Sequence, residues 1–114
     1  MTRDEYRKAF HLPDDYVLSD LPYTEMGDLR NMVLLRHPKW DARFCGINGG
    51  LQIIFFKRGR RVCDVVLHEW SYGGEDGLLE FYAGDDVTGY LNAEEAYAEV
   101  VKALRGTGKD LEEK

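Results

Sequence analysis

The apolar positions are densest in two segments, "LQIIFFK" at residues 51–57 and "RRVCDVVLHEW" at residues 60–70. Both are rich in β-branched and aromatic residues, which favour β-strands. Arg58 and Gly59 lie between them and suit a two-residue turn, because glycine readily adopts the positive φ that such turns require. The pattern therefore predicts a β-hairpin.

The register of this hairpin follows from its turn. Counting outward pairs Lys57 with Arg60, Phe55 with Val62, Ile53 with Asp64, and Leu51 with Val66. One face then carries Leu51, Ile53, Phe55, Val62 and Val66, and the other carries Ile54, Phe56, Cys63, Val65 and Leu67. A strand pair with one solvated face alternates polar and apolar residues, whereas both faces here are apolar. We therefore expect both to be covered, one by a C-terminal helix and the other by the N-terminal half or a partner.

A C-terminal amphipathic helix is predicted over residues 93–104. Asn92 is a good N-cap, and Glu95 follows three residues later, as a capping box requires. Apolar residues recur at the spacing of one buried stripe, namely Ala93, Ala96, Tyr97, Val100, Val101 and Leu104. Gly106 is predicted to end the helix. Residues 107–114 are then predicted to form a flexible acidic tail.

The N-terminal half gives a weaker pattern. Thr2 and Glu5 repeat the capping spacing and predict a short opening helix. Residues 14–31 show no clear periodicity beyond one candidate helical turn at "YTEMGDLRN". The segment "MVLLR" at residues 32–36 is predicted as a strand that Pro38 ends.

A further strand, "GLLEFYA" at residues 77–83, completes the predicted sheet. Together the elements predict an α+β fold, in which an antiparallel β-meander of three to four strands packs with an N-terminal helix and a C-terminal amphipathic helix. A length of 114 residues fits one domain, which we place at residues 1–106.

Composition favours an ordinary cytoplasmic protein. No apolar segment approaches the roughly 20 residues of a membrane span, and the start "MTRDEYRKAF" lacks the apolar core of a signal peptide. Cys45 and Cys63 are therefore expected to be reduced thiols. We predict a cytoplasmic location and no membrane contact.

The net charge of −6 is unevenly distributed. Residues 72–114 carry four Lys/Arg and eleven Asp/Glu, a net charge of −7, whereas residues 51–71 have a net charge of +2. This acidity argues against direct nucleic-acid binding, because phosphates would be repelled. The basic turn consists of Lys57, Arg58, Arg60 and Arg61. Either these charges keep the apolar strands from pairing with other chains, or they contact a phosphate or an acidic partner.

No residues with catalytic or metal-binding spacing emerge. The three histidines and two cysteines include no C-x-x-C or H-x-x-x-H pair. The glycine-rich "CGINGG" precedes a strand, the wrong order for a dinucleotide-binding loop, and "GTGKD" lacks the Ser/Thr of a Walker loop. We therefore predict no cofactor, no metal and no catalytic residue, and the chain is not expected to be an enzyme.

The segment "HEWSYGGEDGLLEFYAGDDVTGY" interleaves aromatic and acidic residues on glycine-rich turns. Its candidate partner-binding residues are Trp70, Tyr72, Glu75, Asp76, Tyr82, Asp85 and Asp86, to which Glu94, Glu95 and Glu99 could add. Aromatic side chains among acids, on loops held by a sheet, suit a basic protein surface. In the alternative interpretation Trp70, Phe81 and Tyr90 belong to the core, and the acids only solvate their loops.

The leading hypothesis is a non-catalytic module that binds a basic protein surface. In size, acidity and lack of a catalytic set, the chain resembles small accessory proteins of phages and mobile elements. These include anti-CRISPR-type inhibitors, which often occupy basic nucleic-acid channels with carboxylates. The resemblance is one of general character and covers no specific motif.

Two alternatives stay open at this point. In a small-ligand or nucleotide-binding domain, the basic turn would bind a phosphate while Trp70 or Tyr72 stacks on a base. In a homodimer, the spare apolar face of the hairpin would bind a second copy of the chain.

Overall fold

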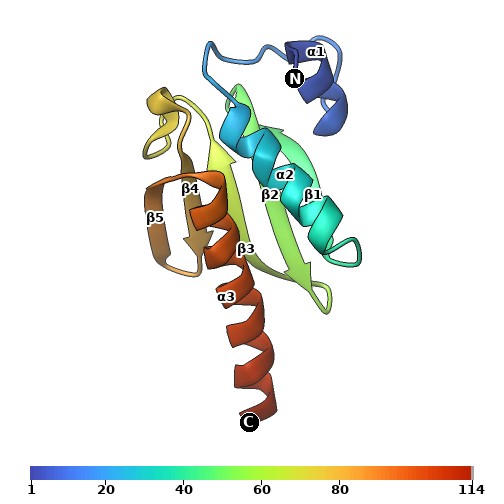
Figure 1. Cartoon of the computed structure of the whole chain (residues 1–114), viewed down its shortest axis with the longest axis vertical. Coiled ribbons are helices and arrows are strands. Elements are labelled where there is room, and N and C mark those ends of the chain that lie inside the picture. Colours follow the sequence, from blue (N-terminus) through green and yellow to red (C-terminus); the bar gives the residue numbers. More distant parts are fainter. Residues whose placement is uncertain (114) are drawn as a thin grey trace.

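The computed structural model describes residues 1–113, with side chains through residue 106. Its elements are α1 (Arg3–Ala9), α2 (Thr24–Arg36), β1 (Asp41–Ile47), β2 (Gly50–Lys57), β3 (Arg60–Leu67), the 3-10 helix η1 (Gly74–Asp76), β4 (Leu79–Ala83), β5 (Asp86–Leu91) and α3 (Ala93–Glu113). Within these residues the strands form one antiparallel sheet in the order β1-β2-β3-β4-β5 (Figure 1). The predicted α+β meander is confirmed, with five strands in place of three to four.

Both predicted capping boxes are present. The Thr2 hydroxyl accepts from the Glu5 amide at 3.2 Å, and the Thr2 amide donates to Glu5 at 3.0 Å. Asn92 and Glu95 make the same reciprocal pair at the start of α3, at 2.8 and 3.0 Å. Helix α3 continues past Gly106, so the predicted end there is wrong. The helix runs over two glycines, Gly106 and Gly108, each of which costs only about 1 kcal/mol, and it contains no proline. The predicted flexible tail at 107–114 lies outside the residues whose side chains are described.

The predicted strand at residues 32–36 is wrong, because these residues form the last turns of α2. The buried residues Met26, Leu29 and Val33 lie on the core side of the helix, at i, i+3 and i+7. Leu34 and Leu35 are exposed, Leu35 by 83%. Because these two apolar residues follow Val33 directly, the sequence shows an apolar run typical of a strand in place of the 3.6-residue spacing of a helix.

The β2–β3 hairpin forms through the predicted Arg58-Gly59 turn, where both residues have positive φ. Lys57 pairs with Arg60 as predicted, but a bulge next to Phe55 shifts every later pair by one residue. The observed pairs beyond the bulge are Phe55 with Cys63, Ile54 with Asp64, Ile53 with Val65, Gln52 with Val66, and Leu51 with Leu67.

This shift corrects the prediction of two apolar faces. It brings six buried apolar hairpin residues to one face: Leu51, Ile53, Phe55, Cys63, Val65 and Leu67. Helices α2 and α3 cover that face and share one core with it (Figure 1). The second face is mixed: it carries Gln52, Asp64 and Glu80 together with the apolar Ile54, Phe56 and Val66, and no helix of the described chain covers it. The homodimer hypothesis, which rested on a spare apolar face, stays a prediction.

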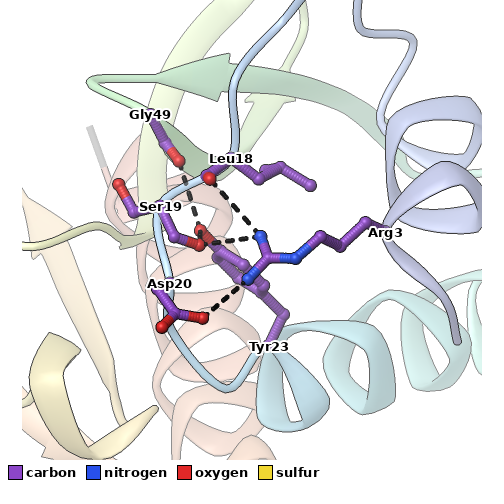
Figure 2. Close-up of polar contacts among 6 residues, drawn as sticks. All are labelled: Arg3, Leu18, Ser19, Asp20, Tyr23 and Gly49. Atoms are coloured by element: carbon purple, nitrogen blue, oxygen red, sulfur yellow. Dashed lines mark hydrogen bonds and ion pairs between the residues drawn. The ribbon is translucent and has the colours of Figure 1, made fainter.

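The segment between α1 and α2, for which the sequence predicts no clear element, is held by polar contacts with residues far away in the chain. The Arg3 guanidinium donates to the carbonyls of Leu18 and Ser19 and pairs with Asp20 at 2.9 Å (Figure 2). The Tyr23 hydroxyl lies 3.0 Å from the Ser19 carbonyl and 3.2 Å from that of Gly49, at the β1–β2 turn. These contacts fix the segment beside the turn and bring Pro22 next to the loop that follows β3.

Candidate functional site

The loop of residues 68–78, between β3 and β4, is held by its own hydrogen bonds. The Ser71 hydroxyl accepts from the His68 amide at 3.0 Å and donates to the His68 carbonyl at 2.8 Å. The Trp70 amide donates to His68 Nδ1 at 3.1 Å. Gly73 and Gly77 have φ of 91° and 74°, in the region that favours glycine. The chain therefore enters and leaves η1 along a path that few other residues could follow.

Glu80 anchors this loop to the sheet. Its side chain is 2% exposed, and its Oε2 accepts from the Tyr72 amide at 2.5 Å. The Tyr82 hydroxyl also donates to Glu80, and this bond, together with burial, raises the pKa of Tyr82 to about 12. A buried carboxyl group is tolerated only when such donors satisfy it. Glu80 thus fixes the backbone of the loop where Tyr72 leaves it.

Three large aromatic side chains are exposed at this end of the sheet. Trp70 is 72% exposed, Tyr72 61% and Tyr90 62%, and we call them the aromatic cluster. The Tyr90 amide donates to the Tyr72 carbonyl at 3.1 Å, so β5 lies directly against the loop. The core interpretation therefore holds for Phe81, which is 4% exposed, but not for Trp70 or Tyr90.

The predicted acidic residues lie at both ends of β4. Glu75 and Asp76 are exposed on η1, beside the aromatic cluster. Asp85 and Asp86 are exposed at the β4–β5 turn, and Tyr82 lies half-buried between the two groups. A strand of five residues spans roughly 14 Å. The structure thus brings Trp70, Tyr72, Glu75 and Asp76 together, and places Asp85 and Asp86 apart from them.

Replacing Tyr82 with phenylalanine is expected to lower the free energy of unfolding by about 1 kcal/mol at pH 7, because the hydrogen bond to Glu80 is lost. The folded pKa of about 12 exceeds the ordinary value of 10.0, so this stabilisation is complete below pH 10 and is lost as the pH rises towards 12. In urea unfolding, the difference between wild type and Tyr82→Phe should therefore shrink from pH 7 to pH 11. Tyr90→Phe is the control, since its exposed ring should leave both values unchanged. An equal difference at both pH values would contradict the prediction.

The four residues of the basic turn do not act as one group. Lys57 Nζ donates to the Leu104 carbonyl at 2.7 Å, and Arg61 pairs with Asp64 at 3.0 Å. Arg58 and Arg60 are exposed and form no ion pair among the side chains that the structure describes.

The basic turn and the aromatic cluster lie at opposite ends of β3. Eight residues of strand span roughly 24 Å. One small ligand therefore cannot contact the turn and also stack on Trp70 or Tyr72. A nucleotide bound at the turn needs a different aromatic residue.

The two cysteines are free thiols on opposite faces of the sheet. Burial raises the pKa of Cys63 to about 12 and also raises the pKa of Cys45. Both therefore stay protonated at neutral pH, which disfavours a nucleophilic role. Among the described residues, no three His, Cys, Asp or Glu side chains lie close enough together to hold a metal ion.

Sequence reasoning missed a second aromatic group, formed by His37, Trp40 and Tyr97. The rings of His37 and Trp40 stack at 3.7 Å with an interplanar angle of 2°, and His37 Nε2 lies 2.7 Å from the Tyr97 hydroxyl. The only signal in the sequence is a tryptophan in the short segment between α2 and β1. That segment shows no periodicity to indicate a neighbour.

Comparison with known protein families, with curated proteins and with solved structures finds no significant match to this chain. Among the described helices, none combines the length and hydrophobicity that a bilayer span requires. The function is therefore argued from the geometry of the site.

Proposed function

We propose that the chain is a non-catalytic protein-binding module, which binds a basic surface of another protein through the aromatic cluster. The observation that carries this proposal is the exposure of Trp70, Tyr72 and Tyr90, by 61–72%. Hydrogen bonds within the loop, to Glu80 and to β5 hold these residues in place. Tryptophan and tyrosine supply most of the affinity at many protein interfaces. A rigid loop lowers the entropy that binding costs, because the side chains are already positioned.

The charge around the aromatic cluster indicates the kind of partner. Glu69, Glu75 and Asp76 are exposed on the same loop, in a chain whose net charge is −6. Such a surface attracts a positively charged protein and speeds the encounter, an effect that salt weakens. A groove that normally binds nucleic acid on another protein has this chemistry. This supports the proposed similarity to accessory inhibitors that occupy basic channels.

Alanine at Trp70 or Tyr72 is expected to weaken partner binding about 30-fold, the effect of losing roughly 2 kcal/mol at a binding hot spot. The partner would be captured from a lysate of the native host at low and at high salt, identified, and its dissociation constant measured by calorimetry. Leu35→Ala is the matched control, because Leu35 is also a large apolar residue and is 83% exposed, but lies on α2. The Leu35→Ala variant should bind the partner with the affinity of the wild type.

Two results would contradict the proposal. One is that no protein is retained specifically at any salt concentration. The other is that Leu35→Ala weakens binding as much as Trp70→Ala, which would move the interface to the helical side of the molecule.

A further inference from the structure

Three segments that are distant in the sequence meet at the end of the sheet opposite the aromatic cluster. They are the α2–β1 connection, the end of β2 with its turn, and the middle of α3 (Figure 1). Between them lies a cleft of about 390 Å³. Small-molecule sites in proteins have volumes of roughly 300–1,000 Å³. The cleft is therefore large enough for a small ligand.

The cleft has an apolar wall that is already ordered. Trp40, Val101 and Leu104 contribute to it. Trp40 is half-buried, stacks on His37 and packs edge-on against Phe55 at 6.1 Å, with an interplanar angle of 89°. These contacts fix the indole ring in one orientation. An aromatic ligand would meet a wall that needs little rearrangement.

The rim of the cleft is strongly basic in an otherwise acidic protein. Lys39, Arg58 and Arg105 line it, and none forms an ion pair among the side chains that the structure describes. Lys57 adds a fourth positive charge, although its Nζ is bound to the Leu104 carbonyl. Asp41 is the single acid among the described lining residues. Guanidinium groups beside an apolar wall suit phosphate oxygens, which they can bind through paired hydrogen bonds.

We propose that this cleft binds a mononucleotide, with the base against Trp40 and the phosphate at Arg58 and Arg105. An aromatic ring joined to a phosphate is the chemistry that matches both the wall and the rim. The size of the cleft and the net charge of −6 favour a small molecule over a polynucleotide, whose further phosphates the acidic surface would repel. This site is independent of the aromatic cluster and of the protein-binding function.

The test is a titration of the full chain with AMP, GMP, CMP and UMP. Binding is monitored by the fluorescence of Trp40 in the Trp70→Phe variant, which removes the other tryptophan. At least one nucleotide should bind, and the corresponding nucleoside or inorganic phosphate alone should bind at least tenfold more weakly. Arg58→Ala and Arg105→Ala should each lower the affinity about tenfold or more, since each removes a charged hydrogen-bond donor. Arg60→Ala is the matched control: Arg60 is an exposed arginine of the same turn that does not line the cleft, and its replacement should leave the affinity unchanged.

Three results would overturn this proposal. They are the absence of a response to all four nucleotides at millimolar concentration, an equal loss of affinity in Arg60→Ala, and tighter binding of a single-stranded oligonucleotide than of any mononucleotide. Trp70→Ala and Tyr72→Ala should keep nucleotide binding intact. A failure here therefore leaves the protein-binding proposal untouched, and the reverse also holds.

Discussion

Replacing Glu80 with alanine is expected to lower the free energy of unfolding by about 3 kcal/mol and to release the loop that carries Trp70 and Tyr72. The substitution removes the acceptor of the Tyr72 amide and of the Tyr82 hydroxyl, two partly buried groups whose lost hydrogen bonds cost about 1 kcal/mol each. It also leaves a cavity at a position that is 2% exposed. Urea unfolding gives the stability, and hydrogen exchange at the Tyr72 amide reports directly on the loop.

Glu80→Gln is the control for this prediction. Glutamine has nearly the same shape and keeps one acceptor oxygen, so it should cost only about 1 kcal/mol and preserve protection of the Tyr72 amide. If the alanine variant stays within about 1 kcal/mol of the wild type and keeps that protection, Glu80 does not anchor the loop. The rigidity on which the proposed protein-binding function depends would then need another source.

The parts of the fold that the sequence predicts correctly are those decided locally. The capping residues of α1 and α3 contact groups only three positions away, and the Arg58-Gly59 turn needs nothing beyond its own backbone preferences. Strand β1 was missed although Asn48-Gly49 is a strong hairpin signal, and both residues have the positive φ of such a turn. A local signal for this hairpin is therefore present in the sequence.

Other features depend on contacts that a single sequence does not reveal. The bulge next to Phe55 moves Cys63, Val65 and Leu67 to the other face, and nothing in the pattern marks Val62 as the extra residue. Strand β5 contains a glycine and a residue of positive φ, Tyr90, and it forms only by pairing with β4. In both cases the tertiary structure overrides the local pattern.

The candidate site was predicted in its composition but not in its geometry. The interleaving of aromatic and acidic residues indicates a surface, yet it cannot show that Trp70 is exposed while Phe81 is buried, because that depends on the register of β4. It also cannot separate Glu75 and Asp76 from Asp85 and Asp86. The sequence does not predict the cleft beside Trp40 at all, because the residues that line it come from three distant segments.

The second large effect is expected for Gly74→Ala, at about 3 kcal/mol of lost stability together with loss of binding through the aromatic cluster. A Cβ atom on Gly74 would lie 2.0 Å from the His68 carbonyl oxygen and 2.7 Å from the Ser71 hydroxyl, both of which are held by the hydrogen bonds of the loop. The loop must therefore move as a unit, and Trp70 and Tyr72 move with it.

Gly59→Ala separates this steric effect from backbone strain. Gly59 has a φ of 77°, but no atom lies within 4 Å of the position that a Cβ would take there. Alanine at this position therefore meets only the cost of the left-handed conformation, about 1 kcal/mol. Gly74 has no such φ, so its cost is steric alone. Urea unfolding of the two variants should thus rank Gly74→Ala well below Gly59→Ala in stability. The opposite ranking would mean that the loop can yield, and that the aromatic cluster is not held in one position before its partner arrives.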